Sequence, residues 1–361
     1  MNTITLNPGA AALQADAGHR RGARLVLLLA LLLALALAAA SSLGAVSVQL
    51  SDWAQAFATG RSGSAQVLWE LRVPRALMAA AVGAALGLAG ALSQGLFRNP
   101  LADPGLLGVT SGAVCAVALT LTVFATAASG LPAPWRPWAL PLAAFAGALG
   151  VCLLLHQVAR WLTPGSVAGL LLTGLALNAL TMAVVGLCTF IASDEQLRSL
   201  SFWTLGSLAG ATWAVAGLLM LAVALALWQG RRLAAALNAL ALGEAAAAHV
   251  GVDVPRLRRA LVLTIALLSA LAVAWCGLIG FIGLMAPHLV RGAAGADQRR
   301  VLPLAALAGA LLLVVADTAA RLVVLPAEVP VGILTALIGA PAFLLLLRGV
   351  ARQQGGHAGA R

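Results

Sequence analysis

Several residue types are absent or scarce in this chain of 361 residues. It has no Lys and no Tyr, and only 9% of its residues are charged, whereas an ordinary soluble domain has about 25%. So few charges cannot cover the surface of a soluble globule, which excludes a soluble enzyme. Because 62% of the residues are apolar, an intrinsically disordered chain is excluded as well. The composition therefore predicts an all-α polytopic membrane protein.

The missing Lys excludes a specific activity. A phosphate-binding P-loop needs a Lys directly after its second Gly, so this chain cannot hydrolyse ATP on such a loop. We therefore expect no cofactor bound by the chain itself. The net charge of +11 comes entirely from Arg, and these arginines lie in short segments between apolar runs. That distribution is typical of membrane topology signals, so no nucleic-acid partner is expected.

Cysteine and histidine give no sign of a metal or catalytic site. The four cysteines all lie inside apolar stretches without a CxxC pair: Cys115, Cys152, Cys188 and Cys276. They are predicted to be small buried side chains. No two histidines have metal-ligand spacing, and no Ser/His/Asp or Cys/His arrangement is present. We predict no catalytic residue and no metal site.

The apolar residues form long unbroken runs, which predict helices rather than the short alternating segments of a transmembrane barrel. The first run, 25–46, follows a basic segment and also has the layout of a secretory signal peptide, but its length favours an uncleaved span. One domain is expected over 25–348, between tails at 1–24 and 349–361. Ten spans are predicted: 25–46, 75–96, 106–128, 138–159, 167–191, 206–228, 257–275, 277–291, 301–320 and 330–347.

The distribution of Arg supports ten spans. With both termini in the cytoplasm, sixteen of the 22 arginines lie on the inner side. The outer side holds the other six: Arg61, Arg72, Arg75, Arg136, Arg198 and Arg321. This asymmetry follows the positive-inside rule. The segment 256–291 is nearly continuous, but merging spans seven and eight would move three further arginines outside, whereas Gly277, Gly280 and Gly283 allow a break there.

Two polar regions stand out between the spans. The inner loop 237–254 contains a short helical stretch that Gly243 and Glu244 open and Gly251 closes. It is either an ordinary amphipathic loop or a rigid knob that binds a partner protein. On the outer side, Arg72 and Arg75 share one helix face, and Arg321 ends the ninth span. These arginines either snorkel from helix ends or form a positive rim for an acidic partner.

Four long motifs make the chain similar to a known family. They are RVPR at 72–75 with QGLFRNPLADPGLLGV at 94–109, LALGE at 240–244 with Gly251, GFIGL at 280–284 with Pro287 and His288, and a final set comprising Ala316, Asp317, Arg321, PAEVPVG at 326–332 and GAP at 339–341. In collinear order from about residue 50 to 348, the chain resembles the permease subunit of the ABC importers for iron-siderophores, haem and cobalamin.

The resemblance implies a cobalamin-permease-like fold of ten transmembrane helices in a bacterial inner membrane. It implies a homodimer, two cytoplasmic ATPase subunits that use ATP and Mg, and a periplasmic substrate-binding protein. It also implies three sets of site residues: a coupling helix with Leu242, Gly243, Glu244, His249 and Gly251; docking arginines Arg72, Arg75 and Arg321; and a cytoplasmic gate at Thr163, Pro164, Gly165 and Ser166.

The segments 97–100, 194–208 and 326–328 look most like haem permeases, and ferric siderophore or cobalamin is the alternative cargo. Haem is flat and apolar and carries two propionates. Arg198 from each subunit of a dimer would meet both carboxylates, and Phe202 and Trp203 would pack on the macrocycle. Alternatively, Arg198 pairs with Asp194 and is purely structural.

Two other classes of membrane protein fit less well. A secondary transporter usually places ionisable residues near mid-membrane, and the central thirds of the predicted spans carry no acid. A membrane-embedded enzyme needs a convergent catalytic set, which the sequence lacks. A P-loop ATPase in a neighbouring reading frame would favour the importer over both.

Overall fold

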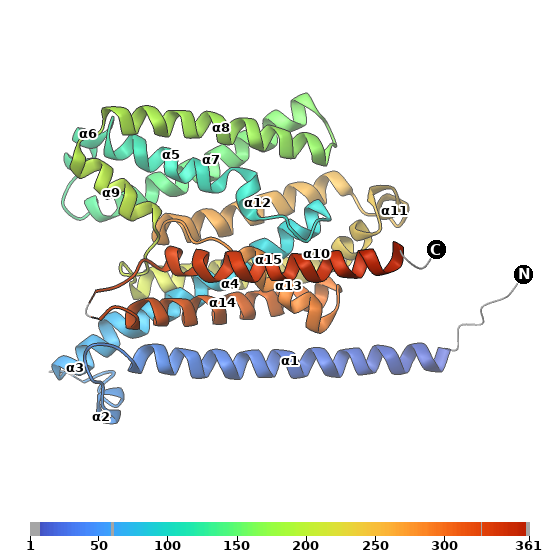
Figure 1. Ribbon diagram of the computed structural model, residues 1–361, viewed down its shortest axis with the longest axis horizontal. Helices are drawn as coiled ribbons and strands as arrows, with labels where there is room; N and C mark the ends of the chain where they lie inside the picture. The colour runs from blue at the N-terminus through green and yellow to red at the C-terminus, as the bar shows by residue number, and fades with distance from the viewer. Residues whose placement is uncertain (1–7, 59–60, 326, 359–361) are drawn as a thin grey trace, which may run out of the picture.

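The computed structural model describes residues 8–58, 61–325 and 327–358, and the described residues form helices without a β-strand. The long helices run roughly parallel to one another along the molecule (Figure 1). Ten helices correspond to the ten predicted spans: α1 (Pro8–Ser42), α4 (Val73–Phe97), α5 (Val109–Leu121), α7 (Arg136–Leu162), α8 (Val167–Ile191), α10 (Trp213–Ala241), α12 (Val254–Cys276), α13 (Ile282–Ala294), α14 (Gln298–Leu322) and α15 (Val331–Ala358). The all-α membrane fold is confirmed, and seven helical stretches are long and apolar enough to cross a membrane.

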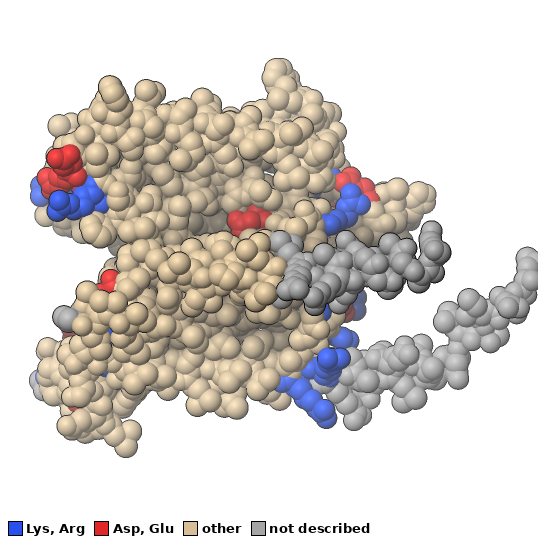
Figure 2. Space-filling model, in the orientation of Figure 1, with Lys and Arg blue, Asp and Glu red and all other residues tan. Residues whose placement is uncertain are grey.

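The short elements are α2 (Leu50–Trp53), α3 (Gly63–Gln66), η1 (Val67–Arg72), η2 (Pro104–Leu107), α6 (Ala125–Ser129), α9 (Asp194–Thr204) and α11 (Glu244–His249). Most of them lie at the two ends of the bundle, whereas η2 lies between the long helices. The helices α2, α3, α6 and α9 lie at one end, and α11 lies at the other, the end at which α1 starts and α15 ends (Figure 1). We call these the outer and inner ends, after the predicted topology. Charged side chains are concentrated at both ends, and the band between them is almost uncharged (Figure 2).

Several predicted boundaries are wrong. The helix α1 begins at Pro8, so most of the predicted polar tail is helical. The helix α10 covers 213–241 instead of 206–228, which shortens the inner loop. The segment 193–201, predicted as a loop, lies mostly in helix α9, because Ser193 and Gln196 form a reciprocal capping box that starts a helix there.

The helix is interrupted between the seventh and eighth spans, as the glycines indicated. The helix α12 ends at Cys276, and Gly277 follows with φ 66°. The next helix, α13, starts after Phe281, which has φ 68° although it is not a glycine. A Cβ atom on Gly277 would collide with the carbonyl oxygen of Trp203, so this position also allows the end of α9 to pack against the break.

The helix α4 forms the centre of the bundle. Most of its side chains are buried against α10, α12, α13 and α14. It packs most closely against α14, where a Cβ on Gly83 or Gly87 would collide with the backbone of Gly309 or Ala305. Because there is no hydrophobic drive between helices within lipid, such small-residue contacts are what hold membrane helices together.

Candidate functional site

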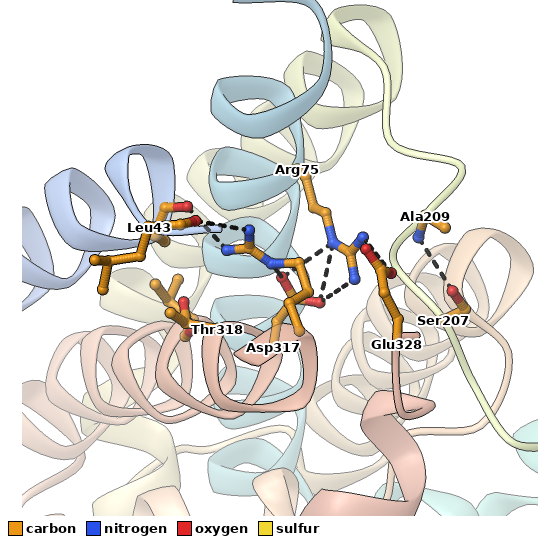
Figure 3. A network of polar contacts seen from close by, with 10 residues as sticks. Leu43, Arg75, Ser207, Ala209, Asp317, Thr318 and Glu328 are labelled. Atoms are coloured by element: carbon orange, nitrogen blue, oxygen red, sulfur yellow. Dashed lines mark hydrogen bonds and ion pairs between the residues drawn. The ribbon is translucent and has the colours of Figure 1, made fainter. Parts of the chain in front are cut away.

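Arg75 is the centre of an ionic cluster at the outer end of α4. Its Nη2 lies 2.9 Å from Oδ1 of Asp317 on α14, and its Nη1 lies 2.7 Å from Oε2 of Glu328, in the segment before α15 (Figure 3). Asp317 is almost completely buried, whereas the Glu328 side chain is 46% exposed. One carboxylate is therefore an internal partner of Arg75, and the other lies at the surface.

Two further arginines complete the cluster and stabilise the end of α1. Arg321 lies 3.3 Å from Asp317, and its Nη2 donates to the carbonyl oxygen of Ala40 at 2.8 Å. Arg72 donates to the carbonyl oxygens of Ser42 at 2.9 Å and Val46 at 2.6 Å. The last turn of α1 has no basic residue of its own, so these two guanidiniums satisfy carbonyls that the helix leaves unpaired.

Arg72, Arg75, Arg321, Asp317 and Glu328 are called the outer arginine cluster below. The sequence suggested a positive rim, but Arg72 and Arg321 are buried and Arg75 is largely covered by its two acids. The guanidiniums therefore have partners within the chain. Its three arginines and Glu328 line a surface cavity of about 510 Å³, together with residues 44–46. The proposed docking role of the three arginines stays a prediction.

The three predicted pathway residues lie together on α9, at the same end of the molecule. Arg198 is exposed, Phe202 is 62% exposed and Trp203 is half-buried. No ion pair joins Arg198 to Asp194 in the described residues, and the role of Arg198 stays a prediction. The helix is held at its end by the Ser207 amide, which donates to the carbonyl oxygen of Cys276 at 2.8 Å.

A largely apolar cavity that the sequence did not predict lies next to the end of α9. It measures about 600 Å³ and is lined by α4, α5, α12 and α15, with Thr204 at the α9 side. Asp103 faces it together with Leu86 and Ser269, which lie near the middles of α4 and α12. The link after α4 was predicted to stay on the inner side, but it folds back into the body of the protein. The only signal for this was the Asp-Pro-Gly turn, in which Asp103 accepts a hydrogen bond from the Gly105 amide at 2.7 Å.

The predicted coupling loop contains the expected short helix, α11. Gly243 precedes it with φ 118° and Gly251 follows with φ 85°, values that favour glycine. Glu244 forms an ion pair with Arg258 of α12 at 2.8 Å, and the His249 ring contacts the Ala245 carbonyl oxygen at 2.7 Å. The ion pair holds α11 against α12, whereas the His249 contact lies within α11.

The outward side of this loop is apolar. Leu242 is 81% exposed and Val250 is 71% exposed, at the end of the molecule where the charged side chains face water. Close by, Asp297 accepts a hydrogen bond from Asn238 at 2.7 Å and joins α14 to α10. Burial raises the pKa of Asp297, but the hydrogen bonds from Asn238 and the Arg299 amide outweigh it and lower the pKa overall. The base of the loop is therefore fixed to the bundle, whereas its apolar tip is exposed.

The four predicted gate residues form an exposed turn between α7 and α8. Gly165 has φ 81°, and the Ser166 hydroxyl accepts from the Gly169 amide at 3.0 Å, capping α8. Thr163 bonds back to the Ala159 carbonyl oxygen at 3.2 Å. These local hydrogen bonds explain why the segment forms a turn. The gating role of the four residues stays a prediction.

Comparisons with known proteins agree on one family. The sequence profile of the FecCD transport family matches residues 28–349. The hemin transport system permease protein HmuU of Yersinia pestis is 45% identical over 294 residues, which cover 80% of this chain and 85% of that protein. The vitamin B12 import system permease protein BtuC of Vibrio cholerae is 43% identical over 298 residues, which cover 82% and 86%. A solved structure of an inward-facing metal-chelate type ABC transporter has a TM-score of 0.78 at 31% identity and covers 90% of this chain and 99% of its own.

Proposed function

This chain belongs to the FecCD transport family and is the permease subunit of an ABC importer, and on that premise we propose that its cargo is haem. The observation that carries the proposal is the exposed face of α9, where Arg198 and Phe202, four residues apart, lie on one side of the helix at the outer end of the bundle. The HmuU relative, which is named for hemin transport, supports the same cargo.

The chemistry of α9 suits a flat dianion. A guanidinium binds a carboxylate through two parallel charge-assisted hydrogen bonds, and an exposed Phe stacks on an apolar ring. Haem has both groups. In the proposed homodimer, two copies of Arg198 would meet the two propionates. Such contacts are weak enough for a conduit, which must release what it admits.

We assign the remaining partners by the two ends of the molecule. Two ATPase subunits, which supply the ATP and Mg chemistry, bind the α11 loop on the cytoplasmic side of the bacterial inner membrane, where both termini lie. The turn 163–166 at that end is the cytoplasmic gate. A periplasmic binding protein docks over the outer arginine cluster. There, an acidic side chain of the binding protein replaces Glu328 on Arg75, because this ion pair is the part of the cluster that solvent reaches.

The test of the cargo is uptake by the reconstituted complex, with haem, ferric siderophore and cobalamin compared side by side. We expect haem to be transported in preference to the other two. Arg198→Ala should reduce haem uptake while leaving assembly and basal ATPase activity unchanged. Arg198→Lys should restore it only in part, because Lys lacks the planar fork.

Arg136→Ala is the matched control, since Arg136 is also an exposed outer arginine and bonds only locally, to the Leu131 carbonyl oxygen at 2.9 Å. Wild-type haem uptake by Arg198→Ala contradicts the propionate role. Uptake of cobalamin or siderophore without haem contradicts the cargo, and the B12 permeases among the relatives make cobalamin the first alternative.

A further inference from the structure

An apolar groove runs along the surface between α10 and α12. It has a volume of about 590 Å³, and leucines from both helices form its walls: the exposed Leu218, Leu221 and Leu225 from α10, and the exposed Leu263 and Leu267 with the half-buried Leu271 from α12. Ala222 lies in the groove and, being small, leaves space between these side chains. Nothing in the transport function above uses this groove.

A hydrogen bond joins the two helices that form the groove. The Thr264 hydroxyl of α12 donates to Oε1 of Gln229 on α10 at 2.8 Å, and both residues line the groove. From Gln229 the leucines of α10 extend outward to Leu218. At 1.5 Å per residue this is about 16 Å, close to the half-thickness of a bilayer core of about 30 Å. The groove is therefore about as long as one leaflet of the bilayer core is thick.

Two arginines lie at the inner end of the groove. Arg232 follows Gln229 by less than one turn, and its guanidinium lies 3.7 Å from the centre of the Trp228 ring, which itself lines the groove. On the antiparallel helix α12, Arg259 precedes Leu263 and Leu267 at four-residue intervals, so it lies on the groove face. Both arginines are exposed. The groove therefore has an apolar body and a doubly positive end.

We propose that this groove binds an anionic phospholipid of the cytoplasmic leaflet. One acyl chain lies between the leucines, and the phosphate sits between Arg232 and Arg259, with the Trp228 ring at the headgroup level where interfacial Trp is common. The leaflet follows from the proposed topology, whereas binding itself depends only on the groove. A second copy of the chain is a poorer occupant. A two-fold axis normal to the membrane would bring the inner ends of two such faces together, and their arginines would repel.

The test compares lipid retained by the purified full chain after exchange into detergent with equal amounts of phosphatidylglycerol and phosphatidylcholine, measured by native mass spectrometry. The wild type should retain phosphatidylglycerol preferentially. Arg232→Gln and Arg259→Gln should each reduce that preference about fivefold, the effect expected for one basic residue at an anionic surface.

Arg256→Gln is the control for charge alone. Arg256 lies on the same inner segment of α12, is 82% exposed and pairs with Asp253, and its loss should leave the preference unchanged. Ala222→Phe fills the groove while keeping both arginines, and it should abolish the retained lipid. Free glycerol phosphate should not compete, because it lacks the acyl chain.

Three results would overturn the proposal. The first is equal loss of phosphatidylglycerol in Arg256→Gln and in Arg232→Gln. The second is unchanged retention in Ala222→Phe. The third is a wild-type dimer that becomes monomeric in Ala222→Phe, which would assign the groove to a second copy. None of these results bears on haem uptake, so failure here is distinguishable from failure of the proposed cargo.

Discussion

The outer arginine cluster and the α11 loop both use arginine–carboxylate pairs, yet they present opposite surfaces. At the outer end, the buried Asp317 lies between two guanidiniums, and Arg72 donates a hydrogen bond to a carbonyl oxygen at the end of α1. At the inner end, one pair between Glu244 and Arg258 fixes the base of the loop and leaves Leu242 exposed. Charge in the sequence pointed to the outer end as the partner surface. Burial shows that most of that charge stabilises the fold.

The comparison indicates where a substitution should affect folding and where it should affect a partner. A buried charge that loses its counter-charge costs the fold more than any exposed pair is worth. An exposed apolar side chain costs the fold little and is typical of a protein interface. Four predictions test this division, from the largest expected effect to the smallest.

Asp317→Ala should have the largest effect. It leaves the guanidiniums of Arg75 and Arg321 buried without their shared carboxylate, which we expect to destabilise the fold by about 3–5 kcal/mol. The measurement is thermal unfolding of the detergent-purified chain. Arg256→Ala, which breaks the exposed pair with Asp253 but keeps the Asp253 cap of α12, is the control and should leave the unfolding temperature nearly unchanged. Equal unfolding temperatures for the two variants would contradict a structural outer cluster.

Leu242→Asp should disrupt the partner rather than the fold. A charged side chain at the centre of an apolar contact costs about 2 kcal/mol or more, which corresponds to about thirtyfold weaker ATPase binding. The unfolding temperature of the isolated permease should not change, because Leu242 is already exposed. Binding is measured by titrating ATPase subunits onto permease in nanodiscs. Undiminished binding together with coupled transport would exclude Leu242 from the interface.

Glu328→Gln should strengthen docking at the outer end. The substitution removes the carboxylate that competes for Arg75, so we expect the binding protein to associate several-fold more tightly at low salt. The gain should fade as the Debye length falls from about 10 Å at 0.1 M to about 3 Å at 1 M salt. This variant tests docking more directly than Arg72→Glu does. Arg72→Glu would place a carboxylate against the carbonyl oxygens of α1 and destabilise the fold. Weaker association in Glu328→Gln would mean that Glu328 itself contacts the binding protein.

Glu244→Gln should have the smallest effect. Its pair with Arg258 is partly exposed, and such pairs contribute about 0–1 kcal/mol, so the unfolding temperature should fall by little. The readout that matters is the ratio of transport to ATP hydrolysis, which should fall if the pair keeps α11 rigid. Gly243→Trp is the harsher companion variant, because a side chain is strained at φ 118°. A normal ratio in both would leave α11 without a coupling role.

Sequence patterns predicted a span well where a capping residue and a long apolar run coincide, as in α8. The helix α8 has the predicted bounds because Ser166 caps its start and the apolar run continues to Ile191. The prediction was wrong for α9, where the polar composition of 193–201 indicated a loop although Ser193 and Gln196 form a capping box. It was also wrong for the link containing Asp103, because hydropathy does not show that a turn folds back between helices. Pro326, the first residue of the last family motif, lies outside the described residues.

The sequence by itself determined the helical membrane class, the break near Gly277, the α11 helix between its two glycines and the resemblance to the importer permeases, because periodicity, composition and local capping are properties of neighbouring residues. Only the tertiary structure decided which charged side chains are exposed and available to bind a partner protein. Arg75 and Asp317 are 242 residues apart in the chain, and Arg72 reaches carbonyls of a different helix. The sequence does not show which carboxylate or carbonyl oxygen an arginine will contact. In the fold these arginines are bonded to such groups from other helices, because burying a charge without a partner is too costly.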